Sequence, residues 1–256
     1  MSGDGQRVPE TPASVPPPRL ERPRRVLVVG ATGRLGVAIA KALAARGDRL
    51  VLTARDAMKL DALAERIAVE SGGERPRVVC ADLRETDAPE RIAAEVRAGG
   101  GLDDVVLACG PFPRTPLEEL RRKDLEDTLA VHAIAPLLLV SALSADLAAR
   151  FGAVVALADA GVARPYTNHV AYLTAKGALQ TGLRALAVEL APNVRVNIVA
   201  LGIVSDPEAD LDPLRTHRLA ARSPLGRFGT PAEVVHAVLS LLDATWSTGE
   251  IWGVGR

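Results

Sequence analysis

The sequence has few aromatic residues, few cysteines, no net charge and no long apolar run. Aromatic residues make up 3% of the 256 residues, so each exposed aromatic side chain is a candidate for a specific task. Lys+Arg and Asp+Glu both number 31, which leaves no overall positive field to hold nucleic acid or an anionic membrane. No apolar run approaches the length of a membrane span. We therefore expect a cytoplasmic protein that binds a small molecule, with neither nucleic acid nor membrane as a partner.

The two cysteines are Cys80 and Cys109. Both fall at the ends of predicted buried strands, so we expect small, reduced core residues. A metal site would need more ligands than these two, and we predict none.

Residues 1–23 differ in composition from the rest of the chain. They include six prolines and few large apolar side chains, too little apolar surface to offset the entropy of ordering. We predict a disordered Pro-rich tail, which lacks the apolar core of a secretory signal; a partner-binding role is the alternative. Residues 24–256 are predicted to form one large domain, because 48% of the chain is hydrophobic and 24% is charged.

A glycine turn follows the first predicted strand. Residues 25–29 are a near-continuous apolar run, Gly30, Gly33 and Gly36 come next, and an Ala-rich helix is predicted over residues 37–46. The glycines allow a tight turn, and the helix N-terminus presents N–H groups and a positive dipole end to a phosphate. This order predicts a dinucleotide pyrophosphate site.

The end of the second predicted strand indicates which dinucleotide binds. NAD sites usually carry an acidic residue there, but the strand predicted over residues 49–54 ends in Thr53 and Ala54 and is followed by Arg55, with no carboxylate. An arginine attracts a 2′-phosphate that a carboxylate would repel. Arg55 therefore favours NADP(H), and Arg34 in the glycine turn adds a second positive charge; a simply solvated Arg55 is the alternative.

Two further strand ends carry candidate residues. Asp82 and Leu83 follow a strand predicted over residues 77–81, where a carboxylate can accept from an adenine amino group. Gly110 opens a Pro-rich loop after a strand predicted over residues 104–109. Phe112 in that loop either stacks on a flat ring above the cofactor or packs under its own loop.

His132 lies in a long helix predicted over residues 123–150 and interrupted by Pro136. A histidine in an apolar helix is more often a hydrogen-bonded core residue than a catalytic group. Both readings remain open from the sequence.

The stretch from Asp159 to Lys176 holds the strongest catalytic candidates. A strand predicted over residues 152–158 delivers Asp159 to a sheet edge, where α/β folds keep their active sites. Tyr172 and Lys176 lie one helical turn apart, so the ammonium is expected to lower the pKa of the phenol. An ordinary surface helix is the alternative.

The last part of the chain completes the predicted fold. A sixth strand is predicted over residues 193–200 and a short final strand over residues 251–254, with Thr230 as the N-cap of the last helix. Residues 201–222 have no clean period, so we predict a substrate lid. Together, these predicted elements indicate a single-domain α/β Rossmann fold, a doubly wound parallel sheet of about seven strands with helices on both faces.

The order of these motifs resembles the short-chain dehydrogenase/reductase family, from about Arg25 to the C-terminus. The resemblance implies that Tyr172 donates the proton and that Lys176 lowers its pKa and binds the nicotinamide ribose. It also implies a homo-oligomer, a tetramer or a dimer, through the helices at 123–150 and 172–190. The implied cofactor contacts are Gly30, Thr32, Gly33, Arg34, Leu35, Gly36, Arg55, Asp82, Leu83, Cys109, Gly110, Tyr172, Lys176, Gly202 and Val204.

Three details are similar to the pteridine-reductase subgroup of that family. Asp159 stands thirteen residues before Tyr172, where most members place a serine. Arg34 begins the Arg-Leu-Gly of the glycine turn and would contact phosphate and substrate, and Phe112 precedes Thr-Pro-Leu and would stack a pterin against the nicotinamide.

The chain also departs from the family pattern. Residues 107–110 replace the usual Asn-Asn-Ala-Gly, and His132 replaces the helix Asn that holds a water for the proton relay. Leu201 replaces the Pro of the usual Pro-Gly. An imidazole can still hold a water.

The expected function is an NADPH-dependent reductase of a pterin-like or related substrate. The predicted catalytic residues are Asp159, Tyr172, Lys176 and His132, and the predicted substrate contacts are Arg34, Phe112, Asp159 and Tyr172. An ionised Asp159 only accepts hydrogen bonds, which suits a substrate that presents N–H groups. A ketone or 3-oxoacyl reductase is the first alternative, and a weakly catalytic NADP(H)-binding or sensing protein is the second.

Overall fold

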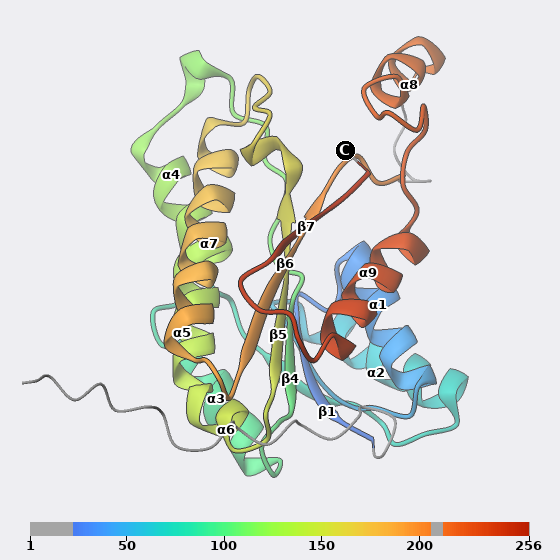
Figure 1. Ribbon diagram of the computed structural model, residues 1–256, viewed down its shortest axis with the longest axis vertical. Helices are drawn as coiled ribbons and strands as arrows, with labels where there is room; N and C mark the ends of the chain where they lie inside the picture. The colour runs from blue at the N-terminus through green and yellow to red at the C-terminus, as the bar shows by residue number, and fades with distance from the viewer. Residues whose placement is uncertain (1–22, 206–211, 256) are drawn as a thin grey trace, which may run out of the picture.

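A parallel sheet forms the centre of the molecule in the computed structural model, which describes residues 23–205 and 212–255 (Figure 1). The seven strands are arranged in the order β3-β2-β1-β4-β5-β6-β7. Their bounds are β1 Arg25–Val29, β2 Arg49–Ala54, β3 Arg77–Cys80, β4 Asp104–Leu107, β5 Ala153–Asp159, β6 Arg195–Leu201 and β7 Ile251–Val254. The order reverses between β1 and β4, the kind of point at which α/β sheets bind ligands. The predicted doubly wound α/β fold is confirmed.

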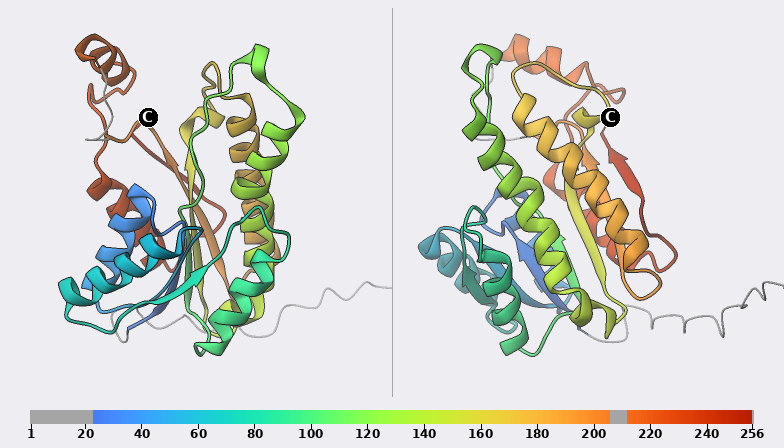
Figure 2. Two further views of the ribbon diagram at one scale, coloured as in Figure 1. Left: turned by 180° about the vertical axis from the view of Figure 1, so that it is seen from behind. Right: turned by 90° about the vertical axis from the view of Figure 1, so that its left-hand side faces the viewer.

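Helices cover both faces of the sheet, as Figure 2 shows. One layer holds α1 (Arg34–Ala45), α2 (Ala57–Ser71) and α9 (Pro231–Asp243). The other holds α3 (Ala88–Ala98), α4 (Arg122–Leu129), α5 (Ala135–Ala142), α6 (Ser144–Ala148) and α7 (Val170–Glu189). With both faces covered, the strands are apolar on both sides.

Alternation along β1 divides the core into two clusters. Leu27 and Val29 pack with the α3, α5 and α7 side of the sheet. Val26 and Val28 pack with α1, α2 and α9 on the other side. Successive side chains of a strand point to opposite faces, so a single apolar run serves both layers.

Side-chain caps and a glycine mark the ends of α2 and the start of α9, where Thr230 was predicted as the N-cap. The Asp56 carboxylate accepts from the Lys59 N–H at 3.0 Å at the start of α2, and Gly72 ends that helix at φ 64°. Thr230 and Glu233 form a capping box at the start of α9. These side chains satisfy N–H groups that a helix leaves unpaired at its first turn.

The long helix predicted over residues 123–150 is instead a series of shorter helices. A π-helical turn, Ala130–Ile134, separates α4 from α5 and contains His132. Pro136 lies in the first turn of α5 and does not break it, because a proline needs no hydrogen-bonded N–H there. The interruption therefore falls at His132, one turn before the residue that was expected to cause it.

Cys80 is exposed, against the expectation that it is a core residue. The reason is the place of β3 at the edge of the sheet, where side chains have neighbours on one side only. Cys109 is partly buried just beyond β4. In the described residues both cysteines are free thiols.

Two predicted segments are only partly described. The predicted tail, apart from Pro23, lies outside the described residues, and so does 206–211 of the predicted lid, residues 201–222. The rest of that lid is not wholly irregular, because α8 (Pro213–Ala220) occupies it. The Asp212 carboxylate accepts from the Leu214 N–H at 2.8 Å at the start of this helix. In Figure 1, α8 lies at the end of the molecule where the loops before α4 and α7 also lie.

One helical stretch, Arg122–Ala142, is long and apolar enough to cross a membrane by length and composition alone. The sequence had not led us to expect such a stretch. Its buried side chains, among them Ala133, Leu139 and Val140, belong to the core cluster beside the sheet. The core helix of a soluble protein passes the same test.

A buried ion pair fixes the start of the domain. Asp104 at the start of β4 is fully buried, and its carboxylate lies 3.0 Å from Nε of Arg24, which is also buried. The same carboxylate accepts from the Ala153 N–H at 2.9 Å. It therefore joins β4 to the residue before β1 and to the first residue of β5.

We expect Asp104→Ala to lower the free energy of unfolding by about 3 to 5 kcal/mol, because it leaves the Arg24 guanidinium buried without its partner. Denaturant titration measures the change. Asp127→Ala is the matched control, because Asp127 pairs with Lys123 at 2.8 Å on the exposed surface of α4 and should change stability by about 0.5 kcal/mol or less. Equal losses in the two variants would contradict the importance of the buried pair.

Candidate active site

The glycine turn between β1 and α1 packs directly against the chain that follows β4. Gly30 has φ 78°, and a Cβ there would lie 2.6 Å from Cα of Cys109. A Cβ on Gly36 would lie 2.2 Å from the Gly30 carbonyl oxygen. Only glycine fits at these two positions. Two backbone segments therefore approach each other closely at the switch point of the sheet, where the sequence predicted a tight glycine turn.

The start of α1 suits a phosphate group. In the described residues α1 has neither a side-chain cap at Gly33 nor an acidic residue in its first turn. The positive end of its dipole is thus not compensated by a side chain of the helix itself. Together with Thr32 and Leu35 in the same turn, these residues fit the pyrophosphate of a dinucleotide.

Arg34 connects this turn to the segment after β6. Its guanidinium donates to the carbonyl oxygen of Ser205 and, at 3.4 Å, to that of Val204. Val204 in turn forms a β-bridge with Gly229. The close packing at Gly202, where a Cβ would lie 2.0 Å from the Gly255 carbonyl oxygen, holds the same segment against the C-terminal end. The structure therefore brings Arg34, Gly202 and Val204 to one side of the glycine turn.

The ends of β2 and β3 bring Arg55 and Asp82 near each other. Arg55 is exposed just after β2. Arg84 donates to the Asp82 carboxylate at 2.5 Å, and this contact, with the positive charge of Arg55 as a smaller cause, lowers the pKa of Asp82 to about 2. Arg84 was not among the residues predicted from the sequence. Its position two residues after a strand-end aspartate was the available signal.

Asp159 and Tyr172 meet at the carboxyl edge of the sheet. Asp159 is the last residue of β5 and pairs with Leu201 of β6, while Tyr172 lies in the first turn of α7. The Tyr172 hydroxyl donates to Oδ2 of Asp159 at 3.0 Å. The Gly161 N–H donates to Oδ1 at 2.6 Å. The structure therefore brings together two of the predicted catalytic residues, Asp159 and Tyr172.

Tyr166 is the third contact of the Asp159 carboxylate, and it was not among the residues predicted from the sequence. Its hydroxyl also donates to Oδ2 of Asp159, at 3.0 Å. Tyr166 and Tyr172 are the two tyrosines of the chain. Because aromatic residues are rare in this chain, a tyrosine six residues before Tyr172 could have indicated a further residue of the site.

Lys176 is buried one turn below Tyr172. Its Nζ donates to the Leu157 carbonyl oxygen at 3.0 Å and lies 5.9 Å from the centroid of the Tyr172 ring. Burial lowers the pKa of Lys176. The pKa of Tyr172 is raised, first by burial and then by the negative charge of Asp159. The expectation that the pKa of Tyr172 lies below its usual value is therefore wrong for this structure, because desolvation and the nearby carboxylate disfavour a phenolate.

His132 lies beside Tyr172 but is deeply buried. It is 1% exposed, and its ring meets the Tyr172 ring edge-on with centroids 5.3 Å apart. Burial, assisted by the positive charge of Lys176, lowers the pKa of His132 to about 3, so the imidazole is neutral at neutral pH. Gly110 makes the space for it, because a Cβ at Gly110 would lie 2.0 Å from the ring.

Phe112 packs against the start of α7. Its ring stacks on His169 with centroids 4.3 Å apart and meets the Tyr172 ring edge-on at 4.9 Å. His169 Nδ1 donates to the Pro113 carbonyl oxygen at 2.8 Å. Phe112 is therefore not packed under its own loop alone, and it remains 60% exposed. The four rings of Phe112, Tyr166, His169 and Tyr172 form an aromatic cluster over the end of β5.

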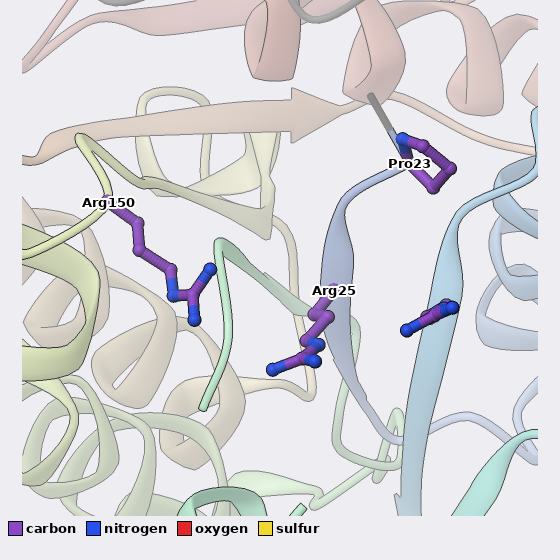
Figure 3. A pocket seen from close by; sticks show the side chains of 4 residues that line it. Pro23, Arg25 and Arg150 are labelled. Atoms are coloured by element: carbon purple, nitrogen blue, oxygen red, sulfur yellow. The ribbon is translucent and has the colours of Figure 1, made fainter. Parts of the chain in front are cut away.

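A separate cavity lies at the opposite end of the sheet (Figure 3). It has a volume of about 270 Å³ and is lined by Pro23, Arg25, Arg49 and Arg150. The side chains of Arg25 and Arg150 both donate to the Gly100 carbonyl oxygen. Arg25 begins β1 whereas Asp159 ends β5, so in a parallel sheet this cavity is at the edge away from Tyr172. It contributes nothing to the candidate active site.

Comparison with known proteins agrees with this arrangement. A family described as "Enoyl-(Acyl carrier protein) reductase" matches residues 30–255. The chain is 33% identical to L-xylulose reductase of Bos taurus over 228 residues, which are 86% of this chain and 89% of the relative. It is 30% identical to glucose 1-dehydrogenase of Gluconobacter oxydans over 241 residues, 89% of this chain and 88% of the relative.

A solved structure shares the fold over nearly its whole length. The 3-oxoacyl (acyl-carrier-protein) reductase of Agrobacterium tumefaciens with NADP bound superposes with a TM-score of 0.84 at 28% identity, covering 91% of this chain and 93% of that one. With a strand-end glycine turn, a buried Tyr-Lys pair and relatives of this kind, the chain belongs to the short-chain dehydrogenase/reductase family of NAD(P)-dependent oxidoreductases.

Proposed function

We propose that this protein is an NADPH-dependent reductase of a ketone that carries neighbouring hydroxyl groups, such as a keto sugar or polyol. The observation that carries the proposal is the Tyr172 hydroxyl, bonded to Asp159 at 3.0 Å at the carboxyl edge of β5. It lies at the same edge of the sheet as the glycine turn. The similarity to L-xylulose reductase and glucose 1-dehydrogenase supports a sugar-like substrate.

The chain's own residues handle the proton of this reaction. When bound, the cofactor supplies the hydride that reduces the carbonyl carbon. Tyr172 stays protonated at neutral pH because burial and Asp159 raise its pKa, and it then gives its proton to the carbonyl oxygen. Lys176, with its Nζ 5.9 Å from the ring centroid, stabilises the negative charge that is left on the phenol.

Asp159 supports a hydroxylated substrate. Many members of the family have a serine here that donates to the carbonyl oxygen, whereas an ionised carboxylate only accepts hydrogen bonds. A hydroxyl group next to the carbonyl offers a donor that Asp159 can accept. A simple ketone offers none, so it satisfies the carboxylate less well.

A pterin-like heterocycle is the second candidate substrate. It too presents N–H groups to an acceptor such as Asp159, and the half-exposed ring of Phe112 offers a flat surface beside Tyr172. The relatives named above are reductases and dehydrogenases of sugars and of oxoacyl groups, which favours the carbonyl substrate over this one.

Arg55 supports NADP(H) over NAD(H). It is exposed at the end of β2, with no carboxylate at residues 53–55 that would repel a 2′-phosphate. Arg34 lies in the neighbouring glycine turn. A related structure with NADP bound is consistent with this choice.

Tyr172→Phe is expected to lower kcat for ketone reduction by about 10²- to 10⁴-fold, because the proton donor is removed. Steady-state NADPH oxidation measures it. Thr174→Ala, an exposed position on the same helix, is the control and should keep wild-type turnover. An unchanged kcat in Tyr172→Phe would contradict the enzyme proposal and favour a protein that only binds or senses NADP(H).

Arg55→Ala should weaken NADPH binding by about tenfold and leave NADH binding nearly unchanged, because only NADPH carries the 2′-phosphate. Fluorescence titration with each nucleotide gives both dissociation constants. Arg66→Ala removes an exposed charge from α2 and should change neither constant. An equal loss of affinity for both nucleotides would show that Arg55 does not bind the 2′-phosphate.

Asp159→Ser should lower kcat/KM for a polyhydroxy ketone by about tenfold and raise it for a simple ketone, because an acceptor is replaced by a donor. Dihydrobiopterin completes the substrate panel. Wild-type turnover of dihydrobiopterin alone would move the function to the second candidate. A gain for the polyhydroxy ketone in the variant would contradict the role proposed for Asp159.

A further inference from the structure

Tyr166 and Tyr172 donate to the same oxygen of one carboxylate. Both hydroxyls lie 3.0 Å from Oδ2 of Asp159. Tyr166 comes from the segment between β5 and α7 and is half-buried. The proposed reaction uses the proton of Tyr172 and gives Tyr166 no task.

The backbone around Gly161 is shaped to hold the Tyr166 ring. A Cβ at Gly161 would lie 2.2 Å from Cε1 of Tyr166 and 2.7 Å from Oδ1 of Asp159. The Gly161 N–H also donates to that Oδ1. The His169 ring packs edge-on against Tyr166 with centroids 5.1 Å apart. The position of the Tyr166 hydroxyl is thus set by several contacts.

The Tyr172 hydroxyl carries one proton and can donate it to one acceptor at a time. To protonate a carbonyl oxygen it must turn away from Asp159, which removes one hydrogen bond from a partly buried carboxylate. A carboxylate oxygen accepts more than one hydrogen bond, so Tyr166 can keep Oδ2 bonded throughout this movement.

We propose that Tyr166 is a positioning residue that keeps Asp159 hydrogen-bonded while the Tyr172 hydroxyl turns to the substrate. The inference rests on the proposed function. The hydride passes from NADPH to the carbonyl carbon, the proton passes from Tyr172 to the carbonyl oxygen, and Tyr166 retains its own proton. In alcohol oxidation the same two transfers run in reverse.

The charged groups around Asp159 and Tyr172 determine how the Tyr166 hydroxyl can stabilise the site. Once Tyr172 has lost its proton, a phenolate lies beside the Asp159 carboxylate, and two like charges repel. Lys176 interacts with Asp159 from within α7, and its Nζ lies 5.9 Å from the centroid of the Tyr172 ring. Arg222 acts on Tyr166 from the segment after α8. His132 faces Tyr172 as a neutral ring, and His169 faces Tyr166. A hydroxyl that donates to Asp159 partly neutralises the carboxylate charge, and this weakens the repulsion between the carboxylate and the phenolate.

Tyr166→Phe removes only this hydroxyl. We expect kcat for ketone reduction to fall by about tenfold, as for the loss of a hydrogen bond to a charged group, with KM for NADPH unchanged. In alcohol oxidation, which needs the Tyr172 phenolate, the rising limb of the pH profile should move to higher pH, because the phenolate is less stabilised. Thr167→Ala, an exposed neighbour, should change neither quantity.

A double-mutant cycle with Asp159→Ser separates this role from simple packing. Without the carboxylate there is nothing for Tyr166 to position, so adding Tyr166→Phe should change kcat by about twofold or less. Equal losses in both backgrounds, or an unmoved pH limb in Tyr166→Phe, would overturn the proposal.

A readout without turnover tests the contact itself. Because the chain has two tyrosines, the ultraviolet absorbance of tyrosinate in Tyr172→Phe reports Tyr166 alone. Adding Asp159→Ser should lower the pH at which Tyr166 ionises, and an unmoved titration would overturn the contact. If the wild-type protein reduces no substrate of the panel, the proposed function fails by itself, and with it the positioning role, whatever this titration shows.

Discussion

The Asp159 carboxylate is the interaction on which the arrangement of the candidate active site depends. It ends β5, receives the hydroxyl of Tyr172 from α7, and receives the Gly161 N–H and the Tyr166 hydroxyl from the segment between them. A carboxylate at a sheet edge gathers donors from each chain segment that passes it. The same charge adds to burial in raising the pKa of Tyr172, so it helps to keep the proposed proton donor protonated.

The packed core brings the donors of Asp159 to one edge of the sheet. Strand ends align across the sheet, with Val29 of β1 paired to Thr53 of β2 and to Leu107 of β4. Two apolar clusters, one on each face, hold the strands in this register. The glycine turn, the loop with Phe112 and the end of β5 therefore leave the sheet at one edge. Local departures from regular structure occur there, as at the π-helical turn that contains His132.

Residues that the family usually keeps have been replaced here by groups with different chemistry. His132 is buried and neutral beside Tyr172, and Gly110, without a Cβ, leaves the space that its ring fills. Asp159 offers acceptors at a position that more often offers a donor. These changes leave the Tyr172 hydroxyl in place and alter the groups that surround it.

The sequence by itself determined the fold, the glycine turn, the cap at Thr230, and Asp159 and Tyr172 as candidate catalytic residues. Each of these depends on local periodicity or on the order and spacing of motifs along the chain. Only the tertiary structure decided that Tyr166 shares the carboxylate, because the direction of a side chain in an irregular segment depends on its neighbours. It also decided that the pKa of Tyr172 is raised, because burial is a property of the whole packed domain and cannot be read from a lysine one turn away.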